Sequence, residues 1–160
     1  MINSKTTSLT IFTIGHSNRK LDEFINILKK YRINVLVDIR RFPTSKWKWF
    51  CKENLSKALE NNGIKYVYLG EYLGGFRKEG FRNYMKTKKF ENGLNSLLNC
   101  AKGNRTAIMC AEKIVFKCTR LHISRKLEEL GVRVIHIVDA DKSFELRSIK
   151  EIKKRSTSDF

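Results

Sequence analysis

Short apolar runs alternate along this chain with longer segments of helical period, and this alternation limits the fold more than any other feature. In 20–31, for example, Leu21, Phe24 and Leu28 fall on one helical face. The runs predicted as strands are 11–15, 34–40, 64–70, 105–112 and 132–139, and the helices are predicted in 20–31, 52–63, 81–103 (one short, one longer), 119–131 and 143–154. Strands separated by helices are joined by right-handed crossovers. We therefore expect an α/β fold with three layers, in which helices cover both faces of a mostly parallel sheet of about five strands.

The length of 160 residues fits one domain with a hydrophobic core of its own. We expect a single α/β domain over 1–160, with flexible tails at 1–9 and 155–160. No apolar run approaches the length that crosses a membrane, so no membrane partner is expected. Residues 1–10 are polar and lack the apolar core of a signal peptide, which favours a cytoplasmic location. The oligomeric state stays open.

A large positive charge is the main compositional feature. The chain carries 33 Lys and Arg against 16 Asp and Glu, a net charge of +17. Such an excess repels itself, and an anionic partner offsets the repulsion. Nucleic acid, DNA or RNA, is the leading candidate because phosphate contacts release counterions. The alternative is a lysine-rich proteome, or a thermophile in which charge serves stability.

The cysteines and glycines lack the spacing of known cofactor sites. The four cysteines show no CxxC pair, and neither a disulfide framework nor a metal site is expected from Cys51, Cys100, Cys110 and Cys118. The Gly74-Gly75 pair lacks the spacing of a P-loop or a dinucleotide fingerprint. No cofactor is therefore expected.

Polar residues follow each predicted strand at the same end. They are His16, Ser17 and Arg19; Asp38, Arg40 and Arg41; Glu71 and Tyr72; Cys110 and Glu112; and Asp139 and Asp141. Ligands of open α/β sheets bind outside the carboxyl ends of the strands. The sequence therefore predicts a site where these segments meet.

Near the first two strands, each residue has a catalytic and a structural interpretation. His16 is a candidate base or, with Ser17, a phosphate ligand, and otherwise a loop residue that caps the next helix. Asp38 is a candidate general base, and otherwise the buried partner of an arginine. Arg40 and Arg41 suit phosphate because a guanidinium donates two bonds at once, although they point to opposite faces if the strand continues.

Two segments further along suggest nucleic-acid contacts. Trp47 and Trp49 alternate with lysines, a pattern typical of a platform on which bases stack. The alternative is that both indoles pack under the following helix. Arg77 and Lys78 follow the Gly74-Gly75 turn, on a loop that could close over an anionic ligand.

The stretch "MCAEKIVFKCTRLH" concentrates the reactive groups. Cys110 ends a strand and Cys118 precedes a helix, where the helix dipole and Arg120 favour a thiolate. We consider Cys110 a candidate nucleophile, Glu112 a candidate acid or base, and Cys118 and Arg120 binding residues. Neither cysteine has an arginine six residues later, as a phosphatase loop requires. Cys110 as a small core residue remains the alternative.

Four segments in order, "TIGHSNRKLDEF", "LVDIRRFP", "YLGEYLGG" and "MCAEKIVFKCTR", resemble the conserved family called domain of unknown function 488. The resemblance spans about residues 11–138 and implies an α/β fold with a shared strand-end site. It implies no reaction. Members of the family usually have Cys-His-Arg where this chain has Cys118-Thr119-Arg120, so a catalytic histidine at that position would be missing here.

These features support three functions. The first is a nucleic-acid-directed enzyme of repair or modification, with bases stacked on tryptophan and chemistry in the strand-end pocket. The second is a nucleic-acid-binding module without catalysis. The third is a small-molecule enzyme that uses a reactive cysteine on a phosphorylated or thiol substrate. The sequence favours the first two together and leaves open whether the protein is an enzyme.

Overall fold

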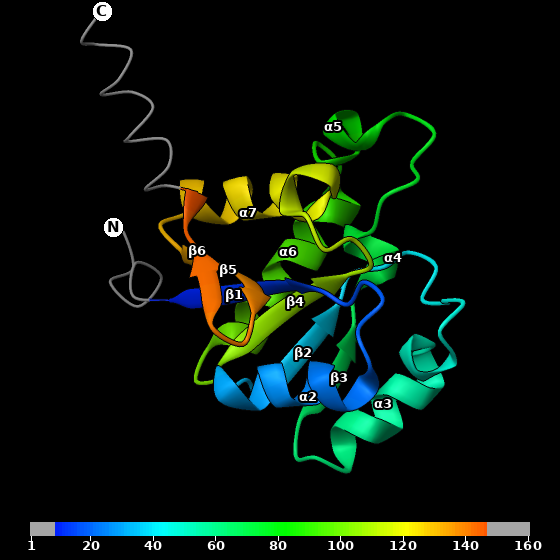
Figure 1. Ribbon diagram of the computed structural model, residues 1–160. Coiled ribbons are helices and arrows are strands. Elements are labelled where there is room, and N and C mark those ends of the chain that lie inside the picture. The colour runs from blue at the N-terminus through cyan, green and yellow to red at the C-terminus, as the bar shows by residue number, and fades with distance from the viewer. Residues whose placement is uncertain (1–8, 147–160) are drawn as a thin grey trace, which may run out of the picture.

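A computed structural model describes residues 9–146 of the protein and shows a six-stranded sheet between helices (Figure 1). The strands are β1 (Thr10–Gly15), β2 (Val35–Asp38), β3 (Lys65–Tyr68), β4 (Thr106–Cys110), β5 (Arg133–Asp139) and β6 (Lys142–Phe144), arranged in the order β3-β2-β4-β1-β5-β6. All neighbours pair in parallel except β6, which is antiparallel to β5. The α/β class and the mostly parallel sheet are confirmed.

The helices lie close to where the apolar spacing predicts them. They are α2 (Leu21–Lys30), α3 (Lys52–Glu60), α4 (Gly70–Leu73), α5 (Phe81–Tyr84), α6 (Lys88–Ala101) and α7 (Arg120–Glu129), with short 3₁₀ turns η1 (Lys48–Phe50) and η2 (Val115–Lys117). The sequence did not predict α4, η1 or η2, because each is too short for its apolar residues to show a period.

The apolar side chains of the strands divide between two cores. Val35 and Val37 of β2 pack in one core with α6 and α7, and Leu36 between them packs in the other with α2 and α3. This division follows from the alternation of side chains across a strand. Figure 1 shows α6 and α7 on one side of the sheet and α2 and α3 on the other. Each buried aliphatic or aromatic side chain, such as Phe24, contributes about 1.5–3 kcal/mol.

The helix predicted at 143–154 starts too early: residues 143 and 144 belong to a strand, and among its described residues only Leu146 is helical. Residues Lys142–Phe144 form β6, since the chain turns after Asp139 and pairs back along β5. Residues 147–154 lie outside the described part of the chain. So do the predicted tails, 1–9 and 155–160, apart from Leu9. Within residues 9–146, no helix has the length and apolar character that spanning a membrane requires.

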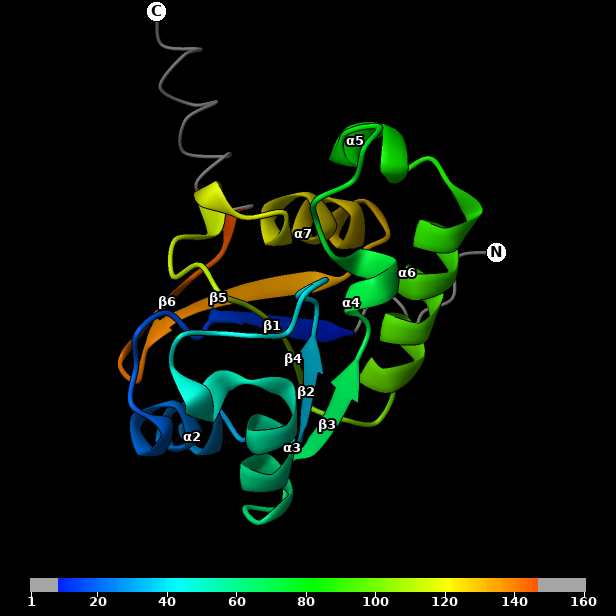
Figure 2. The ribbon, with the colours of Figure 1, turned by 90° about the vertical axis from the view of Figure 1, so that its right-hand side faces the viewer.

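The connections leave the centre of the sheet in opposite directions. After β1 and β2 the chain enters α2 and α3, whereas after β4, which lies between these two strands, it enters α7 on the other side (Figure 2). Strand ends whose connections diverge in this way leave a crevice, where ligands of open α/β sheets bind. The topology therefore directs attention to the carboxyl ends of β1, β2 and β4.

Candidate functional site

The strand register brings three segments of the chain together at the carboxyl ends of β1, β2 and β4. Gly15 of β1 pairs with Cys110 of β4, and Asp38 of β2 pairs with Met109. The contact continues beyond the strands, because the His16 N–H donates to the Cys110 carbonyl at 2.9 Å. A Cβ at Gly15 would lie 1.9 Å from the Glu112 carbonyl oxygen, so only glycine lets the loop after β4 pass this close.

Asp38 and Arg40 form a buried ion pair with two points of contact. Arg40 Nε donates to Asp38 Oδ1 at 2.9 Å and Arg40 Nη2 to Oδ2 at 2.7 Å. The Tyr66 hydroxyl donates to the same carboxylate at 2.6 Å. Burial opposes the charge of Arg40, but the hydrogen bonds and charge of Asp38 outweigh it and raise the Arg40 pKa. Asp38 has no exposed surface and Arg40 is 7% exposed, so this pair holds the end of β2.

The remaining donors of Arg40 bind neighbouring loops. Arg40 Nη1 donates to the Phe50 carbonyl at 2.7 Å and lies 3.3 Å from His16 Nε2. His16 Nδ1 is 2.8 Å from the Ser17 carbonyl, which accepts only from a protonated Nδ1. Burial, above all, and the charge of Arg40 lower the His16 pKa to about 4. His16 is thus neutral, with its basic nitrogen directed at a cation, an arrangement that suits positioning better than proton abstraction.

Cys110 and Cys118 lie side by side at the start of α7. Their Sγ atoms are 2.6 Å apart, where a disulfide bond would place them at about 2.05 Å. The backbone N–H of Arg120 donates to Cys118 Sγ at 3.4 Å. The hydrogen bond with Cys110 is the main cause that lowers the Cys118 pKa to about 7, against the effect of burial. The N–H and charge of Arg120 and the Thr119 hydroxyl act in the same direction.

The two thiols therefore differ in character. The hydrogen bond with Cys118, together with burial, raises the pKa of Cys110. Cys110 is 6% exposed, whereas Cys118 is half-buried. Cys118 is therefore the thiol of the pair that ionises first, and the thiolate is the reactive form of cysteine.

A cavity of about 300 Å³ opens beside these sulfurs. Its wall includes both cysteines, the arginines of the β2 end, Glu112 and Lys117 from the β4 loop, and two aromatic rings; the residues that bear on the chemistry are Cys110, Cys118, Arg40, Arg41, Glu112, Lys117, Thr119, Phe42 and Phe76. Phe42 and Phe76 are 61% and 83% exposed, and their ring centroids are 5.9 Å apart. The cavity thus combines a thiolate, a basic rim and an apolar surface.

Six of the predicted binding residues do not line this cavity: Ser17, Trp47, Trp49, Arg77, Lys78 and Arg120. Trp47 and Trp49 are half-buried against the α2–α3 core, and Trp49 Nε1 donates to the Arg19 carbonyl at 3.0 Å. Arg77 donates to the carbonyls of Glu71 in α4 and of Gly74 just after it, and its guanidinium lies 3.9 Å from the centre of the Tyr84 ring. Lys78 is exposed and does not line the cavity.

The exposed aromatic residues of the site were not found from sequence. Phe42 and Phe76 line the cavity, whereas the sequence prediction chose the tryptophans. The available signal was position: Phe42 follows Arg41 beyond a strand end, and Phe76 follows the Gly74-Gly75 turn. Arg120 was predicted as a binding residue, and the structure places it in the interior, 1% exposed, beside the thiol pair.

Two further observations favour the thiol pair as the centre of the candidate site. Among residues 9–146, no three His, Cys, Asp or Glu side chains are grouped so that they could hold a metal ion. A larger hollow of about 750 Å³ lies between α2 and the β5–β6 turn. Lys30 pairs with Asp141 there, and the hollow contains neither cysteine.

Fold and site together define an α/β protein with a strand-end cavity built around two thiols. The family model described as Domain of unknown function DUF488 matches residues 20–127, more than half of the chain, so the protein belongs to this family. The resemblance seen in the sequence motifs is confirmed. No curated protein and no solved structure matches the chain.

Removing one partner of the buried ion pair should destabilise the protein strongly. Asp38→Asn leaves the charge of Arg40 buried without its carboxylate, and we expect the free energy of unfolding in urea to fall by about 3 kcal/mol. The double variant Asp38→Asn/Arg40→Gln should lose less than the sum of the single variants. Arg41→Gln, at the half-exposed neighbouring arginine, should cost less than about 1 kcal/mol. Strict additivity of the Asp38 and Arg40 effects would contradict the pairing.

The reactivity of Cys118 should follow its lowered pKa. In a Cys51→Ser/Cys100→Ser background, the alkylation rate of Cys118 by iodoacetamide should rise with pH around a midpoint near 7. Cys110→Ala removes the S–H donor and should move this midpoint up by about 1 pH unit or more. Cys110→Ser keeps a donor and should leave it nearly unchanged. Equal midpoints for the alanine and serine variants would show that Cys110 does not stabilise the thiolate.

Proposed function

We propose that the protein is a thiol-dependent enzyme that carries out thiol–disulfide exchange on a small anionic substrate. The proposal is supported above all by the 2.6 Å approach of Cys118 Sγ to Cys110 Sγ at the wall of a cavity. One thiol is half-exposed with a lowered pKa, and the other is buried with a raised one. This asymmetry is what an attacking thiol and a resolving thiol require.

The reaction has two steps. The Cys118 thiolate attacks one sulfur of a substrate disulfide, the S–S bond breaks, and the first substrate thiolate leaves. Cys110 then attacks Cys118 Sγ in the mixed disulfide, which releases the second substrate thiol and forms a Cys110–Cys118 disulfide. Cys110 loses its proton in this step, and the departing substrate thiolate takes that proton up. A cellular low-molecular-weight thiol reduces the internal disulfide, and cytoplasm is accordingly the proposed location.

The rim of the cavity bears on the class of substrate. Arg41 and Lys117 place two positive charges there against the single carboxylate of Glu112. A cationic rim attracts anions and raises their local concentration. Phe42 and Phe76 offer an exposed apolar surface beside it. A disulfide with negative charges and a flat or apolar body fits this combination.

This proposal changes the roles that the sequence suggested. The sequence analysis took Cys110 as the nucleophile and Cys118 as a binding residue. The pKa values and exposure favour the reverse. Arg40 and Asp38 position the end of β2, since their hydrogen-bonding atoms are occupied by each other and by protein groups.

The anionic aromatic disulfide 5,5′-dithiobis(2-nitrobenzoate) should distinguish the two thiols. In the Cys51→Ser/Cys100→Ser background, we expect Cys118 and Cys110 to react in turn with one reagent molecule. Both halves of the reagent should then be released, and intact mass should show the loss of two hydrogen atoms and no adduct. With Cys110→Ser added, one half should stay on Cys118 as a stable mixed disulfide.

The matched control is Cys118→Ser, which should react slowly because it leaves only the buried thiol. A persistent adduct on the protein with both cysteines would show that Cys110 does not resolve the mixed disulfide. Rapid reaction of Cys118→Ser would assign the attack to Cys110 and so refute the roles proposed here.

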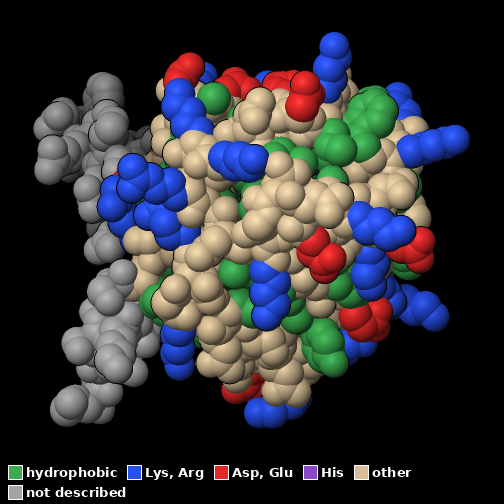
Figure 3. Space-filling model, turned by 90° about the horizontal axis from the view of Figure 1, so that it is seen from below, with side chains coloured by type: hydrophobic (Ala, Val, Ile, Leu, Met, Phe, Trp, Pro, Cys, Tyr) green, Lys and Arg blue, Asp and Glu red, His purple; other side chains and the backbone are tan. Residues whose placement is uncertain are grey.

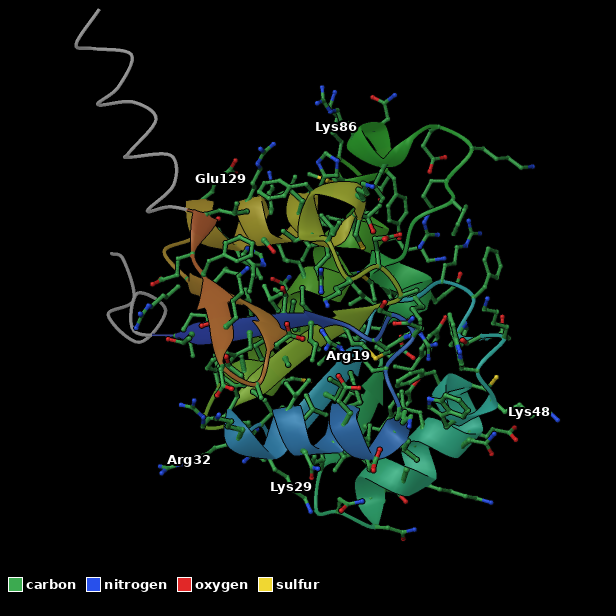
Figure 4. The ribbon with its side chains drawn as sticks, viewed as in Figure 1. Arg19, Lys29, Arg32, Lys48, Lys86 and Glu129 are labelled. Atoms are coloured by element: carbon green, nitrogen blue, oxygen red, sulfur yellow. The ribbon has the colours of Figure 1, made fainter. Side chains whose placement is uncertain are left out.

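Binding of nucleic acid is a second candidate function, favoured by the net charge of +17. Lys and Arg side chains stand at many places on the face shown in Figure 3, with Asp and Glu between them. Lys29 and Arg32 point outward at the end of α2, and Lys48 and Lys86 point outward from two other parts of the molecule (Figure 4). This distribution supports electrostatic contacts with a phosphate backbone that do not depend on base sequence.

A salt titration tests this second function separately. The affinity for a fluorescent single-stranded oligonucleotide should fall at least about tenfold between roughly 50 and 200 mM salt, because each phosphate contact releases counterions. Cys118→Ser should bind as the unmodified chain does, since the contacts are made by surface cations. Binding that is absent at low salt, or that does not depend on salt, would eliminate the nucleic-acid function and leave the thiol proposal intact.

A further inference from the structure

A second cavity, of about 360 Å³, has Arg120 in its wall and lies between η2 and the strands β5 and β6. It shares no lining residue with the first cavity. Its wall is formed mainly by apolar and aromatic side chains together with two buried basic groups; it includes Lys113, Ile114, Val115, Phe116, Arg120, His136, Ile137 and Phe144.

Arg120 places a buried positive charge at this wall. Its side chain is fully enclosed, and the residue is 1% exposed. Arg120 Nη2 donates to the carbonyl oxygens of Glu112 and Lys113, both at 3.1 Å. Nε and Nη1 have no hydrogen-bond partner in the part of the chain that the structure describes. Two carbonyl dipoles do not balance a full charge, and the Cys118 sulfur accepts from the Arg120 backbone N–H and not from these two nitrogens, so the buried side chain lacks a hydrogen-bonded anion.

His136 adds a third unsatisfied nitrogen to the same cavity. Its Nδ1 lies 2.7 Å from the Thr13 hydroxyl, and within residues 9–146 its Nε2 has no partner. Burial and the charge of Arg120 lower the His136 pKa to about 4, so the ring is neutral at neutral pH. If the Thr13 hydroxyl donates to Nδ1, the ring hydrogen sits on Nε2. Buried polar groups left unsatisfied in this way commonly mark an ion or a ligand.

We propose that this cavity binds a small organic carboxylate. One negative charge would balance Arg120, and the carboxylate oxygens would accept from Arg120 and His136. The apolar walls, which include Val115, Phe116 and Phe144, favour an apolar body over a hydrated inorganic ion. The cavity is large enough for one aromatic ring with its carboxylate.

Entry requires a movement of the wall. The three unsatisfied nitrogens have almost no accessible surface, so a ligand must displace a side chain to reach them. Phe116 is the candidate, since it is 56% exposed and its ring stacks on Phe144 with centroids 6.3 Å apart. An exposed side chain can turn aside without opening the core.

Benzoate is the probe that fits this site, with its binding measured by calorimetry. We expect the unmodified protein to bind benzoate at least about tenfold more tightly than benzyl alcohol, which lacks the negative charge, and than inorganic phosphate, which lacks the apolar ring. Arg120→Gln should abolish binding, and Phe116→Ala should weaken it several-fold without removing the buried charge. Arg125→Gln, at an exposed arginine on the same helix, should bind as the unmodified protein does.

Two results would overturn the proposal. One is a failure of benzoate to bind, or equal binding of benzoate and benzyl alcohol. The other is binding that is lost in Arg41→Gln and kept in Phe116→Ala, since this would place benzoate in the first cavity. Thermal unfolding of each variant shows whether it is folded. If Arg120→Gln is not folded, benzoate binding to Phe116→Ala tests the proposal. The test does not depend on thiol chemistry.

Discussion

The insertion of β4 between β1 and β2 constrains everything at the carboxyl edge of the sheet. β4 follows β3 in the chain but pairs with β2 on one side and β1 on the other. Its outgoing chain leads to β5 and must therefore pass the end of β1, whose own loop leaves toward α2. Gly15 allows that crossing, because a Cβ there would collide with the Glu112 carbonyl. The crossing loop then turns through η2 and brings Cys118 back to Cys110, the residue where β4 ends.

Two buried arginines, Arg40 and Arg120, differ in how their positive charges are balanced. The counterion of Arg40 is Asp38, two residues earlier in the chain. The Tyr66 hydroxyl donates to the same carboxylate, so the ion pair is satisfied by protein groups. Arg120 is equally enclosed but has only carbonyl oxygens, and two of its nitrogens have no partner among the described residues. Both side chains are buried, but only Arg40 is paired with a carboxylate, so we interpret Arg40 as structural. Arg120 is the one whose charge remains available to a ligand or to a neighbouring thiolate.

The sequence predicted the periodic elements well and the local geometry poorly. The helix expected at 20–31 is found at Leu21–Lys30, because its buried positions repeat with a clear helical period. The strand β6 has three residues and no apolar run, so nothing in its composition contradicted a helix. The convergence of strand ends followed from topology. Arg40 Nη1 donates to the Phe50 carbonyl, ten residues away across a loop, and no local sequence pattern indicates this hydrogen bond.

The same limit explains the exchange of roles between the cysteines. From its position in the sequence, Cys118 was predicted to lie at a helix N-terminus. The helix dipole by itself lowers the pKa of a thiol only modestly. The larger effect is the hydrogen bond from Cys110, which needs the 3₁₀ turn to fold the intervening loop back on itself. The residue between Cys118 and Arg120 contributes as well, since the Thr119 hydroxyl favours the thiolate. In this chain the Thr119 hydroxyl therefore supports the thiolate directly, and no imidazole base is needed to ionise Cys118.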